Sequence, residues 1–221
     1  MDDKITITEN SLKLDRDEDG LFLTDGEKVL RGDFTRMLPR VRKGRWQHEL
    51  LVKASRLKAR GSNLAIDATA GLGEDSILLA AAGYEVVMFE QDEMIAALLE
   101  DALERARKDE ATYEIAGRMS LVKGNSIDGM LTYKGDKPDI IYLDPMFPAR
   151  NKSGLIKKKF QLIQRLEKPG QEEEALLDAA LKLRPSRVII KRPAKGPYIA
   201  DKKADFSYTG GQVRYDCFSF L

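Results

Sequence analysis

Residues 63–76 read Asn-Leu-Ala-Ile-Asp-Ala-Thr-Ala-Gly-Leu-Gly-Glu-Asp-Ser. A short apolar run is followed by an acid, two glycines and a polar helix start, which is typical of the strand, turn and helix entry of a nucleotide-binding α/β unit. Gly71 and Gly73 lack a Cβ, so the turn can approach a ligand closely, and the next helix offers free backbone N–H groups. This stretch predicts a ligand site.

Strands and helices alternate from residue 64 onward, which predicts an α/β fold with a mostly parallel sheet. Strands are expected over 64–67, 85–90, 120–123, 139–144 and 187–191. Helices are expected over 75–82, 94–108, 154–166 and 171–183. Two alternating segments around Gly210-Gly211 predict a C-terminal antiparallel hairpin. The seven strands together resemble the Rossmann-like layout of class I methyltransferases.

The chain before this alternation predicts two smaller units. Short apolar alternations separated by turn residues indicate a small β meander over residues 1–38, ahead of a main domain over 39–221. Helical spacing of apolar residues then indicates one amphipathic helix that ends at Gly61, built on Trp46, Leu50, Leu51, Ala54 and Leu57. Trp46 is interpreted as its packing anchor.

Composition indicates a globular protein, since 43% of the 221 residues are hydrophobic and 33% are charged. Cys217 is the single cysteine, which excludes an intrachain disulfide and a cysteine zinc cluster, and we expect no bound metal. The sequence shows neither a signal peptide nor an apolar run long enough to cross a bilayer. We therefore expect a cytoplasmic protein.

Basic residues are concentrated in three segments, 36–60, 150–168 and 184–203, although the formal net charge is only +1. If these segments meet on one side of the fold, they form a phosphate-binding face. The alternative is that each is an ordinary solvated surface balanced by acidic helices elsewhere.

Polar residues follow the expected strands at their carboxyl ends, where open α/β sheets bind ligands. Glu90 ends the second strand roughly twenty residues after the glycines, the usual place of an acid that accepts hydrogen bonds from ribose hydroxyls. Asn125 and Ser126 follow the third strand and are expected to contact an adenine. The other candidate cofactor residues in these places are Asp67, Gly71, Gly73, Glu74, Asp75 and Asp144.

The acids favour S-adenosylmethionine over a dinucleotide. The third glycine of the dinucleotide fingerprint is missing after Gly73, and Asp67 and Glu74 would lie badly beside a pyrophosphate. S-adenosylmethionine has no phosphate and carries a positively charged sulfonium and ammonium. Acidic side chains are suitable neighbours for these two groups. The alternative for Glu74 and Asp75 is that they are helix-start carboxylates stabilised by the helix dipole.

Residues 144–147, Asp-Pro-Met-Phe, resemble the Asp/Asn-Pro-Pro-aromatic loop of methyltransferases that modify planar exocyclic amines. The lone pair of such an amine is delocalised, so the amine must be oriented and helped to lose a proton during attack on the methyl group. We expect Asp144 and the carbonyl of Pro145 to accept the amine hydrogens and Phe147 to stack on the base. The alternative is an ordinary strand exit with proline as a helix breaker.

Three blocks, at 67–75, 142–148 and 188–193, resemble the RsmJ family of small-subunit ribosomal RNA guanine-N2 methyltransferases over roughly residues 40–221. The resemblance implies a class I fold, S-adenosylmethionine as donor and a guanine of the small ribosomal subunit as target. It places cofactor contacts at Glu74, Asp75, Glu90, Gln91, Asn125, Ser126 and Asp144. RNA phosphates are expected to contact Lys152, Lys191 and Arg192.

This chain departs from the family pattern at two places. Glu74 stands where the family commonly has arginine, and residues 43–48, Lys-Gly-Arg-Trp-Gln-His, replace a glycine-rich basic segment. Two alternatives therefore stay open: a methyltransferase of the same fold that acts on adenine N6 or a protein glutamine, and a non-catalytic RNA-binding or ribosome-assembly protein. The expected partner is small-subunit ribosomal RNA or the assembling subunit.

Overall fold

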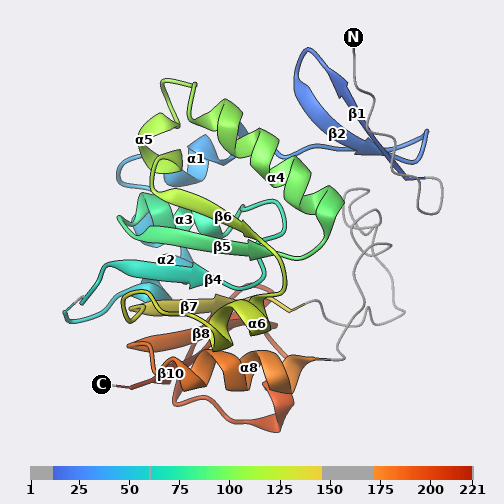
Figure 1. Ribbon diagram of the computed structural model, residues 1–221. Helices are drawn as coiled ribbons and strands as arrows, with labels where there is room; N and C mark the ends of the chain where they lie inside the picture. Colours follow the sequence, from blue (N-terminus) through green and yellow to red (C-terminus); the bar gives the residue numbers. More distant parts are fainter. Residues whose placement is uncertain (1–11, 60, 146–171, 221) are drawn as a thin grey trace.

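The computed structural model describes residues 12–59, 61–145 and 172–220 of the chain. Within these residues, seven strands form one sheet in the order β6-β5-β4-β7-β8-β10-β9 (Figure 1). The parallel strands are β4 (Leu64–Asp67), β5 (Glu85–Glu90), β6 (Met119–Lys123), β7 (Ile140–Leu143) and β8 (Arg187–Pro193). The antiparallel pair is β9 (Phe206–Gly210) and β10 (Val213–Ser219). The predicted fold class is confirmed.

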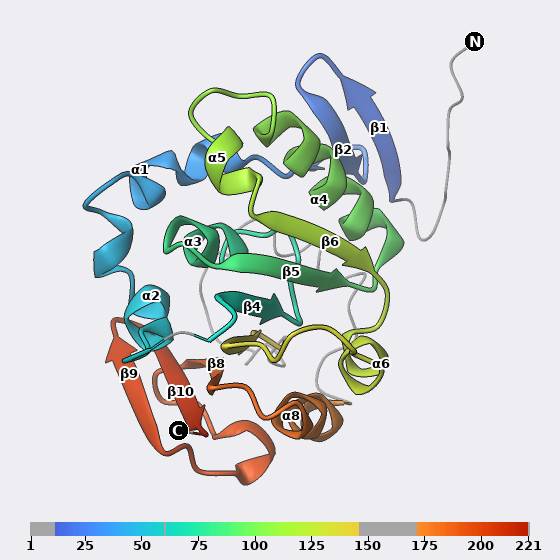
Figure 2. The same ribbon diagram turned by 60° about the vertical axis from the view of Figure 1, so that its left-hand side comes forward.

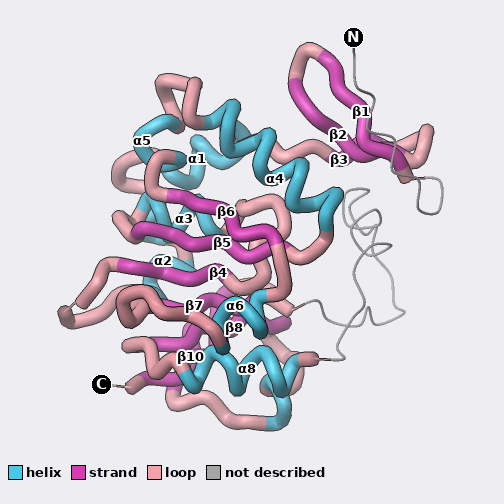
Figure 3. The backbone as a smooth tube through the Cα atoms, viewed as in Figure 1, coloured by secondary structure: helices cyan, strands magenta, loops and turns pink. Residues whose placement is uncertain are grey.

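Apolar side chains alternate between two cores because successive residues of a strand point to opposite faces of the sheet. In β7, Ile140 and Tyr142 join one core, whereas Ile141 and Leu143 join the other. Figures 2 and 3 show the helices placed around the sheet. The first core includes residues of α1 (Leu38–Val41), α2 (Leu50–Ser55), α3 (Ser76–Ala81), α4 (Glu93–Ala106) and α5 (Tyr113–Ala116). The second includes residues of α6 (Ser126–Leu131) and α8 (Glu173–Lys182).

The amphipathic helix expected from Trp46 onward is broken in two. A 3₁₀ turn, η2 (Trp46–His48), is followed by extended backbone at Glu49 before α2 begins. Glu49 is held at this break by Arg40, whose Nη2 lies 2.6 Å from Glu49 Oε2. The packing role of Trp46 is confirmed, since the half-buried ring packs against the first core. The helix expected over 154–166 lies outside the described residues.

An N-terminal sheet of β1 (Lys13–Asp17), β2 (Gly20–Thr24) and β3 (Val29–Leu30) is antiparallel, as the meander prediction requires. Its buried leucines form a third core with α4. The turn that follows, η1 (Phe34–Met37), already packs into the first core. The proposed boundary at residue 38 therefore lies within continuous apolar packing.

The short helix η3 (Ile199–Asp201) lies between β8 and β9, in the C-terminal part of the chain.

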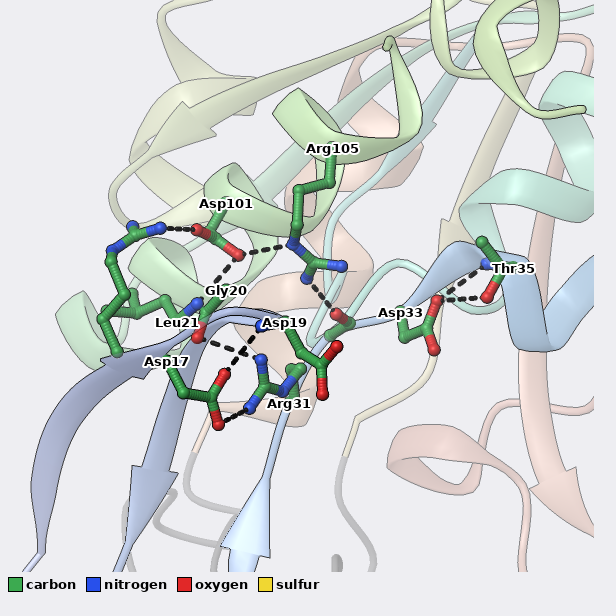
Figure 4. A network of polar contacts seen from close by, with 11 residues as sticks. Asp17, Asp19, Gly20, Leu21, Arg31, Asp33, Thr35, Asp101 and Arg105 are labelled. Atoms are coloured by element: carbon green, nitrogen blue, oxygen red, sulfur yellow. Dashed lines mark hydrogen bonds and ion pairs between the residues drawn. The ribbon is translucent and has the colours of Figure 1, made fainter. Parts of the chain in front are cut away.

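Polar contacts reinforce this packing on α4 (Figure 4). Asp101 Oδ2 accepts hydrogen bonds from Leu21 N at 3.1 Å and Arg105 Nε at 2.8 Å. Asp101 Oδ1 also pairs with Arg16 Nη1 at 2.8 Å, and Arg105 donates to the carbonyl of Gly32. Because α4 starts three residues after Glu90, the N-terminal sheet supports the helix that leaves the candidate site. No helix in the described residues is both long and apolar enough to span a bilayer.

Candidate active site

The glycine turn after β4 uses its two glycines differently. Both have left-handed backbone, with φ of +54° at Gly71 and +76° at Gly73. A Cβ on Gly73 would lie 2.9 Å from both Phe34 Cζ and Leu99 Cδ1, whereas a Cβ on Gly71 would meet nothing within 4 Å. Packing and conformation therefore both require glycine at 73. At 71 only conformation requires it, and open space lies beside the turn.

Glu90 ends β5 and binds this turn directly. Its Oε2 accepts a hydrogen bond from Gly71 N at 2.9 Å, and its Oε1 accepts one from Asp92 N at 2.9 Å. The side chain is only 6% exposed, and burial raises the pKa of the carboxyl. Glu90 thus lies where the sequence places a ribose-binding acid, and in the structure it also fixes the turn.

Gln91 and Asn125 join the ends of β5 and β6. Asn125 Nδ2 donates to Gln91 Oε1 at 3.0 Å. Asn125 Oδ1 accepts from Ile127 N at 2.8 Å and so caps α6, a helix that the sequence reasoning missed. Ser126 is the half-buried first residue of that helix. The adenine contact predicted for Asn125 and Ser126 stays a prediction, since the Asn125 amide already has these partners.

Asp67 lies beneath the glycine turn rather than on its surface. It is 1% exposed, and it accepts hydrogen bonds from Thr69 N at 3.0 Å and from the Ser76 hydroxyl. Burial raises its pKa to about 7, against the effect of these hydrogen bonds. Asp67 therefore braces the turn from inside, whereas Glu74 on the same turn is exposed.

Asp144 leaves the end of β7 beside the glycine turn. Its backbone N donates to Thr69 Oγ1 at 2.7 Å, so Thr69 joins the exits of the first and fourth predicted strands. Pro145 follows and is half-buried. Phe147 and Lys152, the other residues predicted from this loop and its continuation, lie outside the described residues.

A charged cluster lies at the same end of the sheet. Lys191 Nζ is 2.7 Å from Asp75 Oδ2 and 2.8 Å from Asp144 Oδ2. The Tyr142 hydroxyl donates to Asp75 Oδ2 at 2.6 Å. Although burial opposes it, the two carboxylates raise the pKa of Lys191, which keeps the ammonium charged. The structure therefore brings Asp75 and Asp144 together through Lys191, while Tyr142 holds Asp75 from a further side; neither contact was expected.

The prediction that the two basic residues at the end of β8, Lys191 and Arg192, bind RNA requires a correction. Because side chains alternate along a strand, Lys191 and Arg192 point to opposite faces of the sheet. Arg192 is 1% exposed, and its guanidinium binds Glu173 through two hydrogen bonds of 2.8 and 3.0 Å. The prediction that Arg192 contacts RNA phosphate is therefore wrong for this conformation. Lys191 is held by the two carboxylates instead of projecting from the surface.

Only some of the residues predicted to form a basic, phosphate-binding face are both described by the structure and exposed. Arg42, Lys43 and Arg45 are exposed between α1 and α2, whereas Arg187 is buried and donates to the carbonyls of Ala54 and Arg56. The segment 150–168 lies outside the described residues. A single phosphate-binding side of the molecule stays a prediction.

Sequence and structure comparisons agree on the relatives of this chain. Residues 4–220 match the family described as "Putative SAM-dependent methyltransferase". The ribosomal RNA small subunit methyltransferase J of Pseudomonas paraeruginosa is 45% identical over 170 residues, which are 77% of this chain and 65% of that protein. The protein of the same name from Ectopseudomonas mendocina is 39% identical over 218 residues, 96% of this chain and 84% of that protein.

The matched region therefore spans less than two thirds of the first of these relatives. A crystal structure of a SAM-dependent methyltransferase from Neisseria gonorrhoeae has 33% sequence identity and a TM-score of 0.76, and the match covers 97% of this chain and 85% of that one. The matches to the family, to the Ectopseudomonas mendocina protein and to the Neisseria gonorrhoeae structure extend through the N-terminal sheet as well as the seven-stranded sheet. The chain belongs to the SAM-dependent methyltransferase family that includes ribosomal RNA small subunit methyltransferase J.

Proposed function

We propose that this chain transfers a methyl group from S-adenosylmethionine to the exocyclic N2 amine of a guanine in small-subunit ribosomal RNA. The observation that carries the proposal is the 2.7 Å hydrogen bond from Asp144 N to Thr69 Oγ1. This hydrogen bond supports the proposal because it holds Asp144, the residue proposed to accept the amine hydrogen, beside the glycine turn. A methyl donor at the turn and an amine at Asp144 would then be neighbours.

The residues around the turn fit this cofactor. Open space lies beside Gly71, and the exposed Glu74 on the same turn offers negative charge. Such charge complements a sulfonium and an ammonium, whereas it would repel a pyrophosphate. We assign the methionine end to residues 71–75, the ribose to Glu90 and Gln91, and the adenine side to Asn125 and Ser126.

When bound, S-adenosylmethionine supplies an electrophilic methyl group. Asp144 orients the guanine amine by accepting one of its hydrogens, and the Pro145 carbonyl accepts the other, so that the nitrogen lone pair points at the methyl carbon. The amine nitrogen would form its bond to the methyl carbon while the bond from that carbon to sulfur breaks, and S-adenosylhomocysteine would leave. The Asp144 carboxylate would accept the proton that the methylated amine loses. Phe147 is the proposed stacking partner of the base.

The RNA contacts are assigned to exposed basic residues between α1 and α2 and to the segment that follows Asp144 in the sequence. Arg42, Lys43 and Arg45 are exposed, and Lys152 follows the same loop in sequence. Each would neutralise a phosphate, so binding should weaken as salt concentration rises. A ribosomal substrate would place the enzyme in the cytoplasm.

The test is methylation of small ribosomal subunits purified from cells that lack the protein, followed by mass analysis of the modified nucleoside. N2-methylguanosine is the expected product. Asp144→Ala should abolish transfer while leaving the fold intact, and Asp136→Ala, at an exposed residue before β7, serves as the matched control. N6-methyladenosine or a methylated protein would instead identify the same-fold alternative, and full activity of Asp144→Ala would remove the mechanism.

A second experiment addresses the non-catalytic alternative. Titration calorimetry with S-adenosylmethionine should show binding that Glu90→Ala weakens. A chain that binds ribosomal RNA but not S-adenosylmethionine would be an RNA-binding or assembly protein that retains the fold.

A further inference from the structure

We propose that Lys191 is a positioning residue for this reaction, which holds Asp144 in place and in the charged form that can accept an amine proton. The inference rests on the proposed function, because it assigns the amine contact to Asp144. It replaces the role in phosphate binding that the sequence suggested for Lys191.

The strand register places the two residues opposite each other. Leu143, the last residue of β7, pairs with Ile190 of β8, so Asp144, just after β7, comes opposite Lys191 of β8. Lys191 Nζ contacts Asp144 Oδ2 at 2.8 Å. Asp144 Oδ1 lies outside this ion pair, and the side chain is 37% exposed, so a substrate amine can approach that oxygen.

Lys191 is itself fixed from the other side. Its Nζ lies 2.7 Å from Asp75 Oδ2, the same oxygen that accepts the Tyr142 hydroxyl hydrogen bond. The Lys191 side chain is 29% exposed. An ammonium held by two carboxylates at these distances cannot extend to an RNA phosphate without breaking both ion pairs.

Several charged and titratable groups face Asp144 from the surrounding elements. Burial raises the pKa of Asp144, Lys191 lowers it, Asp75 raises it and Arg192 lowers it. Within the described part of the chain, four further groups interact electrostatically with this cluster: Asp67 at the end of β4, Tyr142 on β7, Tyr215 on β10 and Arg40 on α1. Among the described residues, Lys191 is the cation in direct contact with Asp144, so its removal would leave Asp144 beside Asp75 and favour the protonated carboxyl.

The experiment measures kcat and KM from pH 5 to 9, with small ribosomal subunits and saturating S-adenosylmethionine, for wild type, Lys191→Met and Lys191→Arg. Lys191→Met should lower kcat near neutral pH and move the acidic limb of the kcat profile upward by about 1 pH unit or more, the usual effect of a neighbouring cation on a carboxylate. Lys191→Arg should restore the limb. Lys13→Met, which removes an exposed lysine 3.7 Å from Asp15, should behave as wild type.

A direct readout protects the test against loss of folding. Lys191→Gln keeps a hydrogen-bond donor and removes the charge, so it stands in if Lys191→Met unfolds. The titration of Asp144, followed by carboxyl ¹³C NMR and assigned with Asp144→Asn, should move to higher pH in either variant. An unmoved limb and titration, or a raised KM for RNA with unchanged kcat, would overturn the inference.

The proposed function and the role of Lys191 fail in different ways. If the wild-type chain forms no N2-methylguanosine, the proposed function fails, while the NMR titration still reports whether Lys191 sets the charge of Asp144. If wild type forms the product and the acidic limb of Lys191→Met stays in place, only the role of Lys191 fails.

Discussion

Glu90 Oε2 accepts a hydrogen bond from Gly71 N at 2.9 Å, so the acid that ends one strand holds the turn that follows its neighbour. The other carboxylate oxygen accepts Asp92 N at the start of the α4 cap. One buried side chain thus sets the relative positions of the turn and the helix. A ligand bound along the turn would depend on both.

Glu90→Gln should therefore reduce both stability and cofactor binding. The glutamine amide can accept one of the two backbone N–H bonds but presents its NH₂ group to the other, which should lower the free energy of unfolding by about 1–3 kcal/mol. Affinity for S-adenosylmethionine should fall by about tenfold or more. Denaturant unfolding and calorimetry measure the two effects. The control is Glu85→Gln, at the exposed start of the same strand, and a variant equal to this control would contradict the role of Glu90.

Asp67→Asn should change how stability depends on pH. Burial raises the pKa of Asp67 to about 7 in the folded chain, whereas the pKa of an aspartate in an unfolded chain is about 3.9. Between these values the folded chain retains a proton that the unfolded chain has lost, so the free energy of unfolding falls as pH rises through this window. The loss is on the order of a few kcal/mol.

Asparagine cannot ionise, so the stability of Asp67→Asn should decline less than that of wild type between pH 4 and pH 8. Urea unfolding at several pH values measures this difference, with the exposed Asp136→Asn as the control. Parallel curves for wild type and Asp67→Asn would show that Asp67 does not retain its proton in the fold.

Glu173→Ala should destabilise the fold because Arg192 is buried and binds Glu173 through two hydrogen bonds. The expected loss is about 1–3 kcal/mol, and a double-mutant cycle with Arg192→Ala should give a coupling energy of about 0.5–3 kcal/mol. Glu174→Ala, at the exposed neighbouring position, should have little effect.

The same variants test the correction made for Arg192. If Arg192 contacted a phosphate, its loss would reduce the slope of log affinity for RNA against log salt by about 1. We expect no change in that slope for Arg192→Ala, measured below its unfolding temperature. A reduced slope would return Arg192 to the RNA-binding surface.

The parts of the fold that depend on local pattern were predicted well. The bounds of β4 and β5 are those expected. Each strand is a short apolar run between turn residues and an acid, and these flanking residues mark where the strand begins and ends. Asn125 was interpreted only as an adenine contact, although asparagine followed by a helical stretch is also a helix cap. A cap preference applied at that position would have revealed α6.

Pairings across the sheet could not be predicted from the sequence. The blocks that carry Tyr142, Asp144 and Lys191 were recognised, but the contact of one ammonium with two carboxylates requires the strand order and the position of α3. The alternation of side chains along a strand was sufficient to show that Lys191 and Arg192 face opposite sides. The sequence reasoning treated both as surface cations and did not apply that rule.

The two glycines of the turn should respond differently to alanine. Gly71→Ala introduces left-handed strain of about 1–2 kcal/mol, and its new methyl group enters the open space beside the turn, so cofactor affinity should fall more than stability. Gly73→Ala has similar strain and also places a Cβ 2.9 Å from Phe34 and Leu99, which should add about 1–3 kcal/mol of overpacking. Stability should therefore fall most at Gly73.

Thermal unfolding and S-adenosylmethionine calorimetry on both variants separate these effects. Gly26→Ala is the matched control, because Gly26 has φ of +95° and a Cβ added there would meet nothing within 4 Å. Gly26 lies in the turn between β2 and β3 of the N-terminal sheet, so its substitution introduces strain alone. If Gly73→Ala is no less stable than Gly26→Ala, the contact with Phe34 and Leu99 relaxes freely. If Gly71→Ala binds S-adenosylmethionine as wild type does, the cofactor does not approach the turn at that residue, and the proposed placement of its methionine end is wrong.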